Sequence, residues 1–248
     1  MSKKHRCTFT TSSTSTNRGA NGAATLAPTV RIMIVAVPDE LPGEALTNRA
    51  LDQHFNVQGT LTHRFWAIPS MWVWQRSQLV DPRKGHPVYC AGGPARLLNL
   101  DGMRHAAGVG AAVRYQLWSR VVHGTRPATP WTQFLTRHLA DPYTFPRDTA
   151  IAAYNAQPRV NAIRMHNAVT YGAGRIDLCE LEMFQAGCMA YQHYSASTAL
   201  AGDTVLTTEG HRFAPASDAF ADRVTFLEQT NRYFGCIDAD QRLLAVTV

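Results

Sequence analysis

Apolar runs and alternating patterns predict that strands dominate the first part of the chain. Residues 29–37 form a continuous apolar, β-branched run of strand length, which is typical of a buried strand. Weaker alternation predicts strands at 59–68 and at 71–80, the second with Trp72 and Trp74 on one face. This part also holds a short predicted helix, 44–55, and two short predicted strands, 87–91 and 95–100, joined by Gly92-Gly93-Pro94.

The middle of the chain instead has apolar residues at helical spacing. An Ala-rich stretch begins at Asp101, and a second apolar stripe follows Pro130. A proline suits the first turn of a helix, where its missing N–H has no partner to lose. The predicted helices cover 101–122, 131–139, 147–155, 159–169, 177–199 and 217–234, with a hairpin in 203–213 that turns at Glu209-Gly210 and a final strand at 242–248.

The order of these elements predicts an α+β fold. Strands come first, helices follow, and a hairpin and a terminal strand close the chain, whereas a doubly wound parallel sheet would alternate strand and helix. We expect a mixed or antiparallel sheet, built from the N-terminal half plus the C-terminal hairpin and strand, packed with the helical middle. Residues 29–248 are predicted to be one domain, and the Ser/Thr-rich, basic stretch 1–28 a disordered tail.

Composition gives no sign of a membrane-spanning or exported protein. No apolar stretch approaches the roughly 18–20 residues of a transmembrane helix, and the basic start is not followed by an apolar signal segment. The five cysteines are odd in number and widely spread, so we interpret them as reduced thiols in the cytoplasm. Without a CxxC or HExxH motif, no metal and no cofactor are predicted. Without a spanning or signal segment, no membrane partner is expected.

Basic residues are concentrated in the first part of the chain. Residues 1–142 carry 16 basic and 7 acidic side chains, a net charge of +9, whereas 143–248 carry 8 basic and 11 acidic, a net charge of −3. Of the 24 basic residues 21 are arginine, whose planar fork binds phosphate in a bidentate manner, although a GC-rich genome produces the same bias. The asymmetry favours an anionic partner, or pairing between the two oppositely charged parts.

The stretch 97–107 combines a predicted strand, an Asp101-Gly102 turn and a helix start that carries Arg104 and His105. A helix N-terminus offers unpaired N–H groups, so an arginine placed there makes a plausible anion site. The layout resembles the Asp/Asn-Gly-x-Arg box of the partition-protein and sulfiredoxin-like fold, and that resemblance implies a turn that holds nucleotide phosphate. An ordinary Asp-Gly turn beside a solvated arginine would give the same sequence.

No acidic residue occurs between Asp101 and Asp141, while arginine, histidine and tryptophan recur there. Basic side chains interleaved with aromatic rings suit contact with phosphates and stacking on bases, although a solvated helix face beside a Trp-rich core has the same pattern. The residues predicted to bind an anion or nucleic acid are Arg104, His105, Arg114, Arg120, Arg126 and Arg137.

Three functions are compatible with these features. The first is a DNA- or RNA-associated binding protein that contacts phosphates through the Arg-rich helical surface 104–138. The second is an enzyme for a phosphate-bearing substrate or nucleic acid that uses the Asp101-Gly102-Met103-Arg104 turn, and a Cys90–His86 nucleophile pair is a further catalytic hypothesis. The third is a homo-oligomeric interaction module. The sequence assigns no catalytic residue.

Overall fold

The computed structural model describes residues 31–37, 47, 53, 59–217 and 219–248. Within these residues the protein is an α+β fold, as predicted, in which a mixed sheet packs against a helical middle section. The predicted helix 44–55 and the tail 1–28 lie outside the described residues, apart from positions 47 and 53.

Strand β1 (Ile32–Val37) lies at the centre of the sheet, because its apolar run is buried on both faces. It pairs antiparallel with β8 (Arg242–Thr247) over its whole length and parallel with β6 (Thr204–Leu206). The strand order is β2-β8-β1-β6-β7, with β5 also paired to β8. The shorter strands are β2 (Thr60–Leu61), β5 (Gly92–Pro94) and β7 (Arg212–Phe213), while β3 (Phe65–Trp66) and β4 (Tyr89–Cys90) form a separate ladder.

Alternate residues of β1 belong to two hydrophobic clusters, one on each face of the sheet. Ile34 and Ala36 join the main core together with the helices. Met33, Val35 and Val37 join a smaller cluster that includes Val80 and Ala91. The period-2 geometry of a strand therefore makes one short segment part of both cores.

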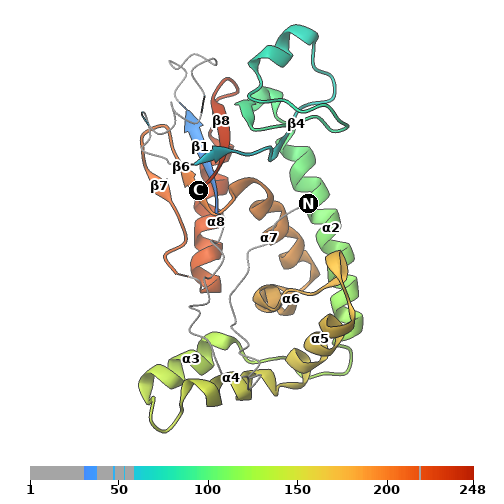
Figure 1. Ribbon diagram of the computed structural model, residues 1–248, viewed down its shortest axis with the longest axis vertical. Helices are drawn as coiled ribbons and strands as arrows, with labels where there is room; N and C mark the ends of the chain where they lie inside the picture. The colour runs from blue at the N-terminus through green and yellow to red at the C-terminus, as the bar shows by residue number, and fades with distance from the viewer. Residues whose placement is uncertain (1–30, 38–46, 48–52, 54–58, 218) are drawn as a thin grey trace, which may run out of the picture.

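Helices form one side and one end of the molecule (Figure 1). The long helix α2 runs beside α7, and these two make the most extensive helix–helix contact in the described chain. Helices α3, α4 and α5 cross the end remote from β4, and we call residues 122–175 the helical arm. The bounds are α2 Leu100–Val121, α3 Trp131–Ala140, α4 Arg147–Asn155, α5 Pro158–Val169, α6 Leu181–Ala186, α7 Cys188–Ala201 and α8 Phe220–Gly235.

Several sequence-based predictions of secondary structure are wrong. Residues 71–80 are not a strand, since Val73–Gln78 forms a 3₁₀-helix, η2. The supposed connector Gly92–Pro94 is itself strand β5, and the 3₁₀-turn η3 (Ala95–Leu97) replaces the strand predicted after it. The single helix expected over 177–199 is divided at Gly187, whose φ of 112° lies outside the helical range.

The described part of the chain has no helix long and apolar enough to span a bilayer. Cys90, Cys188 and Cys236 are free thiols, as expected, whereas Cys179 lies in a disulfide, which departs from the prediction of reduced thiols throughout.

Candidate functional site

Helix α2 separates the predicted anion-binding residues onto two sides. Successive residues of a helix are rotated by about 100°, so Arg104 and Arg114 fall on the side of its buried residues Met103, Ala111 and Trp118. His105 and Arg120 lie on the opposite, exposed side, which also carries Val109 and Val113. The six residues therefore do not form one continuous binding face.

On the inner side, Arg114 joins a polar network with two residues far from it in the sequence. Its Nε donates to the hydroxyl of Tyr191 (2.9 Å), and that hydroxyl donates to Glu180 Oε2 (2.7 Å). Burial raises the pKa of Tyr191, and the negative charge of Glu180 raises it further. The hydroxyl thus stays protonated and connects the arginine to the carboxylate. The Arg114 side chain consequently has a structural partner that its place in the Arg-rich stretch did not reveal.

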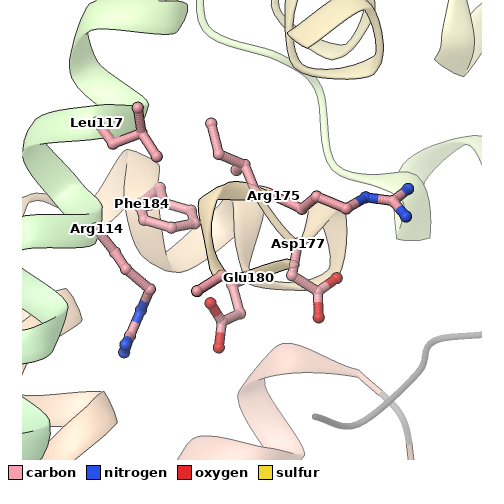
Figure 2. Close-up of a pocket in the computed structure, with 8 residues that line it drawn as sticks. Arg114, Leu117, Arg175, Asp177, Glu180 and Phe184 are labelled. Carbon is pink, nitrogen blue, oxygen red and sulfur yellow. The ribbon is translucent and has the colours of Figure 1, made fainter. Parts of the chain in front are cut away.

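The same network borders a small hollow between α2 and the segment that precedes α6 (Figure 2). Arg114, Asp177 and Glu180 line it together with the apolar side chains of Leu117 and Phe184, around roughly 220 Å³ of space that includes open solvent. Arg114 and Glu180 lie on one side of it, whereas the guanidinium of Arg175 extends away (Figure 2). Opposite charges already face each other in this hollow, which gives it little net attraction for a large anion.

A row of aromatic rings packs next to this network and includes the ring of Tyr191. Phe184 is almost fully buried and stacks on Trp118, with ring centroids 5.3 Å apart and planes 11° apart. Its ring also lies 4.1 Å, centroid to centroid, from that of Tyr191. Tyr115 completes the row against Trp118. Trp118, one of the two tryptophans in the Arg-rich stretch, therefore packs in the core, and its ring is not available to stack on a base.

Arg159 anchors the helical arm to this core. Its guanidinium lies over the Trp118 ring, 5.5 Å from the centroid. It donates from Nε and Nη2 to the hydroxyl and main-chain carbonyl of Thr125, and from Nη1 to Gln185 Oε1. Gln185 in turn pairs with both the N–H and the carbonyl of Ala128. These bonds hold the segment between α2 and α3 against α6.

The Asp101-Gly102-Met103-Arg104 sequence lies inside the first turns of α2 and does not form a turn before the helix. Asn99 is the N-cap, and its Oδ1 accepts the Gly102 N–H at 3.0 Å. Arg104 reaches back to Asp101 at 3.4 Å. The resemblance to a phosphate-binding box therefore lacks its turn, and the Gly102 and Met103 N–H groups and the Arg104 guanidinium already have partners.

The remaining predicted residues lie towards solvent, and three further arginines join them. Arg120 and Arg126 are exposed, while Arg137 covers the ring of Phe145 at 4.2 Å. The exposed residues Arg147, Arg164 and Arg175 were not among the candidates predicted from the sequence. The sequence contained a pattern that could have identified them, because the basic character extends to position 175. Only Asp141 and Asp148 are acidic between positions 102 and 175. Among the described residues, the exposed arginines of this region that have neither an ion pair nor a ring contact are Arg120, Arg126, Arg147, Arg164 and Arg175.

Neither a metal centre nor the suggested nucleophile pair takes shape in the described ranges. No three His, Cys, Asp or Glu residues of these ranges gather closely enough to hold a metal. Cys90 is fully buried, with its thiol directed at the carbonyl of Phe65, whereas His86 is exposed to solvent. A buried thiol beside a carbonyl has no base to activate it.

We therefore expect Cys90 to be chemically inert in the folded protein. Burial raises the pKa of its thiol to about 12, so almost no thiolate exists near pH 8. Iodoacetamide at that pH should modify the exposed Cys236 at least about a thousandfold faster than Cys90. Mass spectrometry of timed samples, with and without urea, measures this ratio. Rapid labelling of Cys90 without urea would contradict the buried position.

Comparisons with other proteins give no further assignment, since no protein-family model, curated protein or solved structure matches the chain.

Proposed function

We propose that the protein is a nucleic-acid-associated binding protein that contacts phosphates through exposed arginines of α2 and the helical arm. The observation that carries the proposal is the set of exposed arginines without an ion pair at positions 120, 126, 147, 164 and 175. A guanidinium that is free of acidic partners can bind a phosphate without first breaking an ion pair. This set differs from the one predicted from the sequence, because it omits Arg104, His105, Arg114 and Arg137 and adds Arg147, Arg164 and Arg175.

The distribution of charge supports an anionic partner for this part of the molecule. Residues 102–175 carry nine arginines and two acidic residues, a net charge of +7, whereas 176–248 carry four arginines and ten acidic residues, a net charge of −6. Because phosphate contacts release counterions from DNA or RNA, such a surface gives affinity without sequence specificity. No groove-reading element is needed for binding of this type.

Removing two of these arginines should weaken binding to duplex DNA and reduce its dependence on salt. For Arg120→Ala/Arg126→Ala we expect about a tenfold loss of affinity at low salt, and a slope of log affinity against log salt that is smaller by about 1.8, or 0.9 per phosphate contact. Fluorescence anisotropy with a labelled duplex at several salt concentrations measures both quantities. The variant Arg164→Ala/Arg175→Ala tests two further exposed arginines of the helical arm in the same way.

The charge-matched control is Arg212→Ala/Arg232→Ala, which removes two exposed arginines outside residues 102–175. Its affinity and salt slope should stay close to those of the unmodified protein. Equal losses in the control and the test variants would show that only net charge matters. Absence of binding at low salt by the unmodified protein would contradict the proposal altogether.

The opposite charges of the two regions also support a second candidate, an oligomer in which the arm of one copy contacts the acidic region of another. Such pairing is screened by salt, so the mass measured by light scattering should fall as salt rises. This change in mass would require no nucleic acid. It therefore distinguishes the oligomer hypothesis from the nucleic-acid-binding hypothesis.

A further inference from the structure

The loop between β3 and β4 projects from the end of the molecule opposite the helical arm (Figure 1). Strand pairing closes this loop at its base. Its base is closed by the pairs Phe65–Cys90 and Trp66–Tyr89, and by a hydrogen bond from the Ala67 N–H to the Val88 carbonyl (2.9 Å). Trp66 and Tyr89 also meet edge to face, 6.2 Å between centroids. The loop is therefore held as an ordered element, which we call the aromatic tip (residues 67–88).

Three consecutive apolar side chains at this tip face solvent. Trp72, Val73 and Trp74 are 70%, 91% and 64% exposed. Their main chain is held at the start of η2, where the Gln75 N–H donates to the Trp72 carbonyl and Gln75 Oε1 accepts the Trp72 N–H at 2.9 Å. Isolated exposed apolar residues are common, but a fixed run of large ones marks a surface that contacts something else.

The same loop also carries exposed basic side chains. Arg76, Arg83 and Lys84 are exposed, and none forms an ion pair with another described residue. The single acidic residue of the sequence between 65 and 95 is Asp81, whose carboxylate lies 2.6 Å from His63 Nε2. The tip thus combines exposed large apolar side chains with exposed cations in one loop.

We propose that the aromatic tip docks on the surface of an anionic lipid bilayer. Indole rings favour the headgroup level of a membrane, and lysine and arginine beside them attract anionic lipids. Val73 would enter the boundary between headgroups and acyl chains, with Trp72 and Trp74 at its sides. Contact of this kind requires no spanning helix, so it is compatible with the absence of one among the described helices.

The exposure of Val73 decides between a bilayer and a single strand of nucleic acid. Aromatic rings with nearby cations also suit stacked bases and their phosphates. An aliphatic side chain has no π-face for aromatic stacking on a base, yet Val73 is the most exposed residue of the three. A bilayer accommodates all three apolar side chains and the cations at once. The expectation of no membrane partner rested only on spanning and signal segments, which do not bear on surface docking.

Vesicle co-sedimentation of the full chain tests the proposal, with vesicles of phosphatidylcholine alone and of phosphatidylcholine mixed with phosphatidylserine. We expect binding to the mixed vesicles, a fall of about tenfold or more in the partition coefficient for Trp72→Ala/Trp74→Ala, and a comparable fall for Arg83→Gln/Lys84→Gln. The matched control, Tyr143→Ala/Tyr171→Ala, removes two aromatic residues that are 97% and 88% exposed in the helical arm and should bind as the unmodified protein does.

Three results would overturn the proposal. They are no binding of the unmodified protein to mixed vesicles at low salt, equal binding by the Trp72→Ala/Trp74→Ala variant, and loss in that variant of single-stranded oligonucleotide binding without any vesicle binding. The last result would assign the tip to nucleic acid. Because the tip variants keep every arginine of the helical arm, their duplex binding should be unchanged, so this proposal and the proposed function can fail separately.

Discussion

Replacing Phe184 with alanine should lower the free energy of unfolding by about 3–5 kcal/mol. The ring is 1% exposed and lies between Trp118 of α2 and Tyr191 of α7. Alanine would leave a cavity where α2, α6 and α7 meet, and the fixed helices around it could collapse only in part. Urea denaturation followed by circular dichroism measures the loss as a lower midpoint at an unchanged slope.

Tyr143→Ala is the control for this substitution, because it removes an aromatic side chain that is 97% exposed. We expect its stability to remain within about 0.5 kcal/mol of that of the unmodified protein. If the two variants were equally stable, the stack of Phe184 on Trp118 would not be part of the core. The stack also supports Arg159, which lies over the Trp118 ring, so amide exchange in the helical arm should rise in Phe184→Ala and not in the control.

Elements determined by local sequence were predicted closely. The helix predicted at 147–155 is α4 (Arg147–Asn155), and the predicted hairpin turns at Gly210, whose φ of 82° suits glycine. Helical spacing and turn chemistry depend on neighbours in the sequence, so one chain suffices to detect them. The break at Gly187 was visible as a glycine, but only the fold shows that the chain uses its positive φ.

The sequence shows only in part which arginines of the candidate site face the core and which face solvent. A helical wheel centred on Met103, Ala111 and Trp118 separates Arg114 from Arg120 on the basis of sequence alone. The partners of Arg114 could not be found in this way, because Tyr191 lies 77 residues along the chain. The acid-free stretch identified a run of basic residues in the sequence. It could not show which of these arginines contact buried residues.

The segment 71–80 shows how alternation can mislead. Trp72 and Trp74 alternate with other residues as they would on one face of a strand, and this alternation predicted a strand. In the structure both rings are exposed, and η2 starts at Val73. Without burial there is no gain from a strand, and the Trp72–Gln75 hydrogen bonds favour the 3₁₀-turn instead.

Replacing Gly92 with alanine should unfold this edge of the sheet or lower the free energy of unfolding by about 3 kcal/mol or more. Gly92 belongs to β5, paired with β8, and a Cβ added there would lie 2.0 Å from the main-chain oxygen of Leu243. That oxygen cannot move unless β8 shifts against the central strand β1, so β5 must withdraw from β8. The sequence suggested a connector at this glycine because glycine is common in turns, whereas the structure needs it for close approach of two backbones.

Gly108→Ala is the matched control, since it adds the same methyl group at a glycine of α2 with no atom within 4 Å of the new Cβ. Alanine favours the helix over glycine by about 1 kcal/mol, so this variant should be more stable than the unmodified protein. Opposite shifts of the two urea midpoints would show that backbone approach, and not loss of glycine as such, decides the effect. A Gly92→Ala protein as stable as the Gly108→Ala protein would mean that β5 does not lie against β8.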